Sequence, residues 1–256
     1  MGRYLYSIAN GNTKLSFGHI GLEESLVYSI PYKDIMAIVH LCSPKPYETD
    51  DEDKAKSWVL EHSYVIDRAT NEFGTVLPFS FDVIIKGDDL TVKNWIQENY
   101  IRIKKELENV ENKAEYSIQI FYDHDTFGKK IVEVNKELED LKEKINSMPQ
   151  GTAYLYQRKY ELSSKKLILE EIDLLSQEFS SIIMQYVGDM KIDKKVSWVP
   201  ERYKDKELMM AFACLVHHEK IDALGDALEE INNREGFAVR FTGPWAPFSF
   251  ARLQEV

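Results

Sequence analysis

Apolar and polar residues alternate with a period of two in several short runs of the first half of the chain. The runs Tyr4–Ala9 and Ser25–Ile30 predict strands. In the run Asp34–Leu41, apolar residues occupy both alternating sets of positions, which predicts a central strand of a sheet. The run Thr75–Ile85 predicts one more strand, in which Pro78 favours an edge position or a bulge.

Apolar residues recur at steps of three and four elsewhere, which indicates helices. In the first half, we expect one helix through Trp58–Phe73 and another that begins near Asp88 or Asp89. A narrow stripe through Ile131–Met148 predicts a long helix, and Pro149 separates it from a second long helix. Two helices joined by a short breaker should form an antiparallel hairpin. The expected seam of the second helix contains Leu155, Leu162, Leu169, Ile172, Phe179, Ile183 and Tyr186.

The second half ends with a strand, a helix and another strand. Leu208–Val216 is a continuous apolar run, Lys220–Ile231 has helical spacing, and Gly236–Phe241 alternates again. With a strand at Glu115–Tyr122, the order is β-α-β-β-α-β, in which the helical hairpin takes the first helix position. We therefore predict an α+β protein of two domains, residues 1–110 and a ferredoxin-like domain of residues 111–256.

Charge and cysteine content narrow the classes of function. Lys and Arg number 32 and Asp and Glu 43 among 256 residues, which gives a net charge of −11. Such an acidic chain lacks the basic surface of a nucleic-acid-binding protein and would be repelled by anionic lipid. Cys42 and Cys214 lie in apolar runs, which favours reduced, buried thiols over a disulfide. With no signal-peptide pattern and no long apolar run, we expect a cytoplasmic protein that binds no membrane and is a monomer.

Three polar clusters could carry chemistry, but each has a structural explanation. His217 and His218 are adjacent, so they cannot face one metal ion from a strand. The cluster Asp123–Asp125 could bind a divalent ion, although aspartate before a helix is an ordinary cap. The acidic run Glu48–Asp53 lacks the glycine and spacing of a calcium loop. We expect no catalytic residue, metal or cofactor.

The segment "FTGPWAPFSF", Phe241–Phe250, is unusually rich in aromatic residues for a chain end. Trp245, Phe248 and Phe250 offer large apolar area with little rotamer entropy to lose. Two interpretations remain open. The segment either packs back on the core with Trp245 as its anchor, or forms an exposed patch that binds a partner.

Four blocks of sequence together resemble the GvpF/GvpL family of gas vesicle proteins. They are "YLYSIA", "HSYVIDRATNEFGTVLPFSF", "GTAYLYQRKYE" and "FTGPWAPFSF", in the family's order and spacing over Tyr4–Phe250. The chain departs from the family pattern at four positions. Ser7 replaces a glycine, Ser80 and Asp82 replace an arginine and a glycine, and Phe248 stands at a common tyrosine position.

The resemblance implies a function that the residues alone do not reveal. Members of this family are accessory or minor structural components of gas vesicles, are not known as enzymes, and associate with the hydrophobic major shell protein GvpA. We therefore expect a protein that binds GvpA and other gas vesicle accessory proteins, and that prevents GvpA aggregation or nucleates vesicle assembly. Two alternatives stay open: a metal-binding protein or enzyme that uses His217, His218 or Asp123–Asp125, and a coiled-coil adaptor that dimerises through Ile131–Met148.

Overall fold

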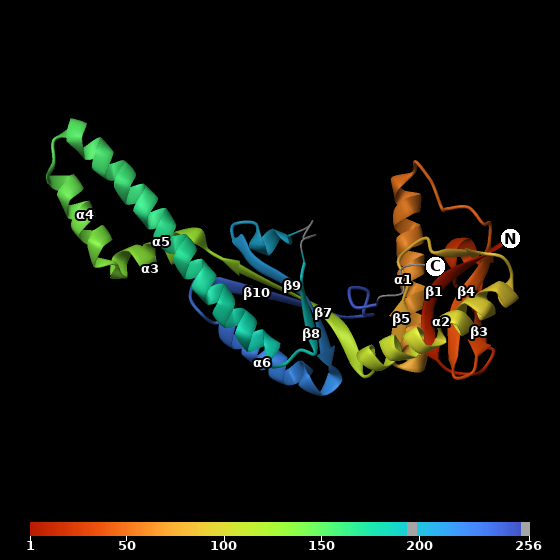
Figure 1. The fold of residues 1–256 in the computed structure, drawn as a ribbon. Helices are drawn as coiled ribbons and strands as arrows, with labels where there is room; N and C mark the ends of the chain where they lie inside the picture. The colour runs from red at the N-terminus through yellow and green to blue at the C-terminus, as the bar shows by residue number, and fades with distance from the viewer. Residues whose placement is uncertain (194–198, 252–256) are drawn as a thin grey trace. The chain divides into compact units, whose positions relative to one another are not determined.

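The structure is a computed structural model that describes residues 1–193 and 199–251, without the side chains of residues 132, 133 and 150–152. Helices and strands are mixed in the α+β manner that the periodicity predicts (Figure 1). The chain forms two compact units. Unit 1 comprises Met1–Tyr116, Leu215–His218 and the chain from Gly243 onward, and unit 2 comprises Ser117–Cys214 and Glu219–Thr242.

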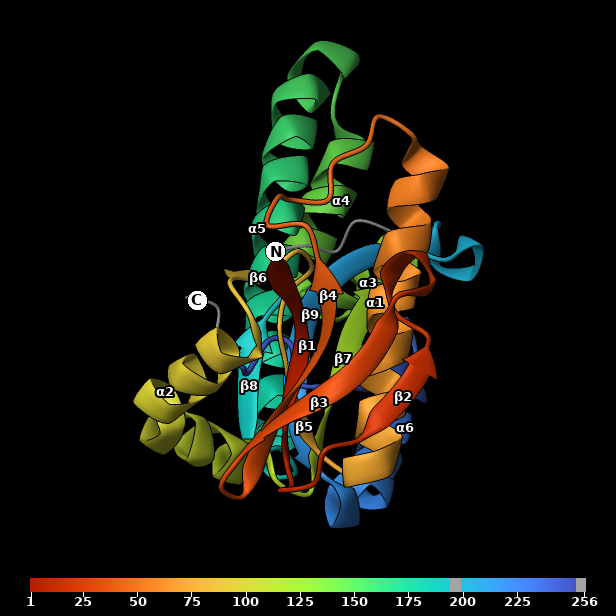
Figure 2. The same cartoon turned by 90° about the vertical axis from the view of Figure 1, so that its right-hand side faces the viewer.

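Unit 1 is built on a sheet of six strands. They are β1 (Gly2–Asn10), β2 (Ser16–His19), β3 (Leu26–Tyr32), β4 (Ile35–Cys42), β5 (Val76–Pro78) and β6 (Ile84–Lys86). The order is β2-β3-β4-β1-β5, and β6 also pairs with β1 (Figure 2). β4 lies between β3 and β1, so the prediction of a central strand is confirmed. The periodicity does not predict β2, because Phe17 is its one large apolar residue.

The segment Thr75–Ile85 differs from its prediction as a single strand. It forms the two short strands β5 and β6, which pair with different parts of β1. Between them Asp82 has a φ of 70°, a left-handed conformation that breaks a strand. Pro78 is the last residue of β5 at the end of the sheet order, which confirms the expected edge position.

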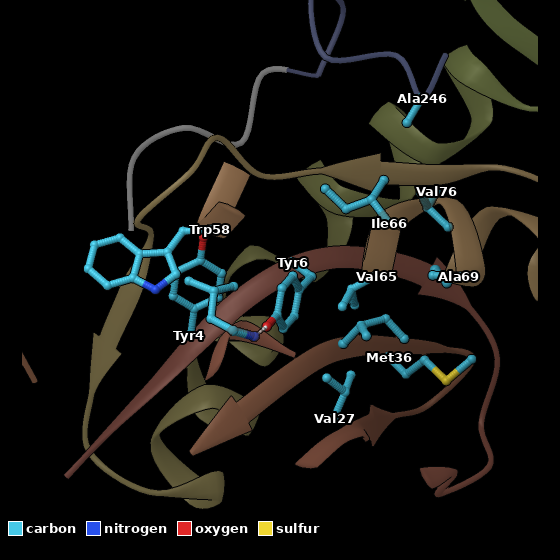
Figure 3. Packing of buried hydrophobic residues seen from close by; sticks show 13 residues of the cluster. Tyr4, Tyr6, Val27, Met36, Trp58, Val65, Ile66, Ala69, Val76 and Ala246 are labelled. Atoms are coloured by element: carbon cyan, nitrogen blue, oxygen red, sulfur yellow. Dashed lines mark hydrogen bonds between the residues drawn. The ribbon is translucent and has the colours of Figure 1, made fainter. Parts of the chain in front are cut away.

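One face of this sheet packs against helix α1 (Glu52–Phe73) (Figure 3). Strands and helix share a single buried cluster, whose members include Tyr4, Tyr6, Ala9, Val27, Met36, Ile38, Trp58, Val65, Ile66, Ala69 and Val76. A β-bulge in β1 between Leu5 and Ser7 shifts the alternation. Both Tyr4 before the bulge and Ala9 after it therefore reach the same cluster.

Helix α2 (Asp89–Val110) covers the other face and contacts β1, β3 and β4. Its buried residues Val92, Ile96, Ile103 and Leu107 recur at helical spacing and lie outside the α1 cluster. Asp88 caps the helix, because its carboxylate accepts the Thr91 N–H at 3.1 Å. The predicted start of this helix is confirmed.

The second sheet has four strands in the order β10-β7-β9-β8. They are β7 (Lys113–Tyr122), β8 (Asp189–Ile192), β9 (Glu207–His217) and β10 (Phe237–Trp245). The helices are α3 (His124–Val134), α4 (Lys136–Ser147), α5 (Gln150–Met184) and α6 (Ile221–Asn232), and short 3₁₀ turns occur at Leu22–Glu24, Glu201–Tyr203 and His218–Lys220. Aromatic packing joins α5 to β10, because the Phe179 and Phe237 rings lie 5.3 Å apart in an edge contact.

The stripe Ile131–Met148 does not form one helix. Asn135 is extended, with φ −96° and ψ 105°, and its side chain accepts the Leu138 N–H at 3.1 Å. An asparagine that caps a new helix ends the old one, so α3 and α4 are separate. Val134, a member of the predicted stripe, is exposed, whereas Leu138 is buried. α4 and α5 then pack against each other across Met148–Pro149 (Figure 1).

The expected seam of α5 is also partly wrong. Phe179 and Ile183 are buried, but Leu155, Leu162 and Leu169 are exposed. A spacing of seven residues falls short of two turns of a straight helix by about 20° each time. Over the 24 residues from Leu155 to Phe179 this rotational shift accumulates. Leu155 therefore points away from the side of α5 on which Phe179 is buried.

Candidate partner-binding site at the C-terminal segment

The C-terminal segment, residues 243–251, begins inside strand β10. The strand does not end with the alternating run at Phe241, because β10 continues through Gly243 and Pro244 to Trp245. Gly243 has a φ of +137°, and a Cβ atom there would lie 2.7 Å from Tyr116 Cδ1 and 2.9 Å from the Glu115 carbonyl oxygen. Glycine is therefore required for the close approach of two backbones rather than for a turn.

Beyond β10 the segment folds into a tight hydrogen-bonded turn that packs on unit 1. The Phe248 N–H donates to the Ala246 carbonyl at 2.8 Å, and the Phe250 N–H donates to the Pro247 carbonyl at 3.0 Å. Ala246 and Phe250 are buried, and Ala246 belongs to the α1 cluster. Phe248 is half-buried, with its ring centroid 6.4 Å from that of His62. The segment thus completes the core of unit 1.

A single carboxylate holds the turn at its surface. Glu115 accepts the Ser249 N–H at 2.7 Å through Oε2 and the Ser249 hydroxyl at 2.6 Å through Oε1. Hydrogen bonds to an ionised carboxylate are stronger than neutral ones. The sequence gives no signal for this pair, because 134 positions separate the two residues.

Trp245 does not anchor the segment. Its side chain is 54% exposed, so the prediction that its ring packs into the core is wrong. Successive residues of a strand point to opposite faces. Ala246, the first residue after β10, lies in the α1 cluster, whereas the Trp245 side chain before it stays exposed.

The exposed indole borders a hollow of about 490 Å³ within unit 1. Its wall is formed by Asp67, Thr70, Asn71, Gly74, Thr75, Val76, Lys113, Ala114, His218, Pro244, Trp245, Ala246 and Pro247. Burial raises the pKa of the Asp67 carboxyl above its ordinary value. Six of these thirteen residues carry polar or charged side chains, and the apolar part of the wall is formed by Trp245, two prolines, a valine and two alanines. This apolar part is suited to an apolar segment of a partner protein.

Beneath the C-terminal segment, the hydrogen bonds of His62 define its tautomer. Its Nε2–H donates to the Phe79 carbonyl at 3.1 Å, so its bare Nδ1 accepts the Tyr4 hydroxyl at 2.9 Å. The Tyr4 oxygen in turn accepts the Asp82 N–H at 3.0 Å. Burial lowers the pKa of His62 to about 4 and raises the pKa of Tyr4. The imidazole is therefore neutral at pH 7.

His40 forms a second buried pair in the same cluster. Leu22 N–H donates to the Tyr6 oxygen at 3.0 Å, and the Tyr6 hydroxyl donates to His40 Nδ1 at 2.8 Å. His40 Nε2–H is then the donor to the Tyr47 oxygen at 3.0 Å. Burial lowers the pKa of His40 to about 4 and raises the pKa of Tyr47 to about 12. Enclosed in the core, these groups hold the strands together and offer no accessible site for a substrate.

The structure puts the other polar clusters from the sequence analysis in different parts of the fold. Asp123 accepts the Thr126 N–H at 2.9 Å and so caps the start of α3, which agrees with its interpretation as a helix cap. His217 ends β9, and the neighbouring His218 lies at the wall of the hollow. Over residues 1–193 and 199–251, no group of three His, Cys, Asp or Glu side chains is placed to hold a metal ion.

The acidic run and the cysteines also have ordinary surroundings. Asp51 caps α1 by accepting the Asp53 N–H at 2.9 Å. Cys42 and Cys214 are free thiols, and burial raises the pKa of the Cys42 thiol. Among the described residues, no helix combines the length and apolar character needed to cross a membrane.

Comparison with known proteins gives consistent matches over nearly the whole chain. A family model described as gas vesicle synthesis protein GvpL/GvpF matches residues 2–252. Gas vesicle protein L1 of Halobacterium salinarum is 29% identical over 254 residues, which cover 98% of this chain and 90% of that protein. Gas vesicle protein L of Haloferax mediterranei is 30% identical over 233 residues, which cover 90% of this chain and 72% of that protein.

Solved structures show the same fold. The crystal structure of GvpF from Anabaena sp. PCC7120 matches with a TM-score of 0.76 and 17% identity, and covers 99% of both chains. GvpF from Microcystis aeruginosa matches with a TM-score of 0.66 and 18% identity, over 98% of this chain and 99% of that one. Because the family model spans the chain from residue 2 to residue 252, this protein belongs to the GvpL/GvpF family of gas vesicle synthesis proteins.

Proposed function

We propose that this protein is a cytoplasmic, gas-vesicle-associated assembly factor that binds the hydrophobic shell protein GvpA. Family membership supports a role among gas vesicle components. A subunit that will tile a water-excluding wall exposes apolar surface before it assembles, and such surface aggregates. A carrier that covers this surface would keep the subunit dispersed until it is added to the growing wall.

The exposed Trp245 beside the hollow is the observation that supports a contact at this point. The rest of the C-terminal segment is held by the core and by Glu115, so the indole is displayed from a rigid support. Tryptophan on a rigid support is the side chain most enriched among residues that dominate binding energy. We propose that an apolar segment of GvpA enters the hollow and covers the indole.

Addition of a strand to a sheet edge is a second way to bind an apolar subunit. The edge strand β10 is already blocked at Val239, whose N–H donates to Asn232 at 2.9 Å and whose carbonyl accepts the Tyr203 hydroxyl at 3.2 Å. Side chains that occupy an edge oppose its pairing with another strand. The hollow is therefore better supported than the β10 edge as the site.

Two details of the fold also belong to this proposal. The strand order β10-β7-β9-β8, with α3–α5 and α6 as connections, supports a ferredoxin-like arrangement for residues 111–256. We further propose a binding role rather than a catalytic one. The histidines whose pKa values are lowered, His40 and His62, are enclosed in the core, where no substrate can reach them.

Co-expression with GvpA tests the proposal. We expect this protein to raise the fraction of GvpA that stays in the supernatant, and Trp245→Ala to abolish much of that gain. Tyr154→Ala is the matched control, because Tyr154 is an aromatic residue of similar exposure on unit 2. Unchanged pelleting of GvpA with the wild-type protein would refute the function, and equal effects of the two variants would refute the site.

A further inference from the structure

Three leucines form an exposed row along α5 that no part of the described fold uses. Leu155, Leu162 and Leu169 are 68%, 63% and 53% exposed. They are spaced by seven residues, so they lie on one side of the helix over about 21 Å of its length. Large apolar residues gathered in one row differ from the isolated ones found on any surface.

A different side of α5 provides its packing inside unit 2. Ile168, Phe179 and Ile183 are buried there, and α3, α4 and α6 contact this helix. The three leucines are therefore not among the residues that α5 buries inside unit 2. Figure 1 shows α5 as a long helix with α4 alongside part of it.

Basic residues flank the row in a chain that is acidic as a whole. Residues 155–169 contain Arg158, Lys159, Lys165 and Lys166 against the single acidic residue Glu161, whereas the chain carries a net charge of −11. These four cations are exposed. Within the part of the chain that the structure describes, Lys166 pairs with Glu170 at 3.6 Å, and the other three have no ion pair.

We propose that this leucine and basic face of α5 docks an acidic amphipathic helix of a partner protein. Leucines repeated every seven residues supply one of the two core positions of a coiled-coil interface, and here charged residues lie beside them. A partner helix with an apolar heptad row and glutamates beside it would bury the leucines and pair with the free cations. This surface is separate from the hollow at Trp245 and does not depend on the GvpA proposal.

The charge pattern distinguishes this occupant from two others. A second copy that docked through the same face would place lysines and arginines against one another, which is costly. An anionic membrane would attract this face but repel the chain's excess of 11 negative charges. A single narrow leucine row also matches a helix better than the wide apolar face that membrane-surface helices carry.

A labelled synthetic peptide tests the proposal by fluorescence anisotropy with the full-length protein. The probe has three heptads with leucines at the core positions and glutamates at the flanking ones, and its control carries lysines in place of the glutamates. We expect the acidic peptide to bind and the basic peptide to bind at least about tenfold more weakly, a difference of about 1.4 kcal/mol. Equal binding of both peptides, or none, would overturn the proposal.

Variants test whether the acidic peptide binds at the leucine and basic face of α5. Leu162→Ser and the charge reversal K165E/K166E should each weaken binding of the acidic peptide about tenfold, about 1.4 kcal/mol. Leu174→Ser is the matched control, because Leu174 is 61% exposed but lies off the row. Equal loss with Leu174→Ser, or binding to phosphatidylserine vesicles without binding to the peptide, would contradict the proposal. Circular dichroism of each variant checks that the fold is retained.

Discussion

Acidification should destabilise unit 1 through its two buried histidines. His40 and His62 have pKa values lowered to about 4, against an ordinary value of 6.5. The unfolded chain takes up a proton at each imidazole below about pH 6.5, whereas the folded chain does so only near pH 4. The stability that this difference provides is fully present above pH 6.5 and is lost as the pH falls toward 4.

The size of the effect follows from the difference between the two pKa values. It is about 2.5 pH units for each imidazole, and one unit corresponds to about 1.4 kcal/mol, which gives about 3 kcal/mol per histidine. Two independent histidines would remove about 7 kcal/mol, comparable to the whole stability of an ordinary domain. The hydrogen bonds supply the physical reason: a proton on His62 Nδ1 would displace the Tyr4 hydroxyl bond.

Urea unfolding followed by circular dichroism between about pH 7 and about pH 4.5 measures this loss. Where both imidazoles titrate only in the unfolded chain, the free energy of unfolding should fall by about 2.7 kcal/mol per pH unit. The raised pKa of Asp67 acts in the opposite direction, so the histidine contribution is best isolated with variants. Tyr4 does not titrate in this range, because burial raises its pKa.

His62→Gln should reduce the slope by about 1.4 kcal/mol per pH unit, since one titrating group is removed. His19→Gln is the control, because His19 is exposed and its Nδ1 contacts the Glu24 carbonyl at 2.9 Å. A stability that stays constant from pH 7 to 4.5 would refute the argument. So would a slope that His62→Gln and His19→Gln change equally.

Three predictions concern the C-terminal segment, and each is measured by urea unfolding. Gly243→Ala should cost about 1–3 kcal/mol, because its Cβ would meet Tyr116 and its φ suits glycine; an unchanged midpoint would refute this packing. Phe250→Ala should cost about 3–5 kcal/mol, whereas Trp245→Ala should stay within about 0.5 kcal/mol; the reverse ranking would show that the indole is the anchor. Glu115→Gln should cost about 1–2 kcal/mol by weakening the two bonds to the turn, and no loss would exclude that role.

Periodicity predicted most elements because each depends on neighbours along the chain. The central position of β4 follows from apolar residues on both of its faces, and the start of α2 follows from Asp88 and its cap. The prediction failed where a local feature interrupts a long pattern. Asn135 splits an apolar stripe into α3 and α4, and Asp82 divides one expected strand into β5 and β6.

The candidate site could be located by composition but not described by it. The sequence marked the aromatic segment around Trp245, Phe248 and Phe250 as unusual, and its blocks pointed to the family. It did not show which ring is buried, because that depends on the face that β10 presents after 240 residues of chain have folded. Aromatic content is the same for an anchor and for an exposed contact, so no local pattern separates them.

The sequence by itself determined the α+β composition, most of the helices and strands, and membership of the GvpL/GvpF family. Tertiary structure alone decided that Glu115 accepts hydrogen bonds from Ser249 and that His62 accepts one from the Tyr4 hydroxyl. It alone also decided that the α5 leucines are exposed. The physical reason is the distance along the chain between the residues that interact. Secondary structure reflects interactions over three or four residues, whereas burial and hydrogen-bond partners depend on residues that only the folded chain brings together.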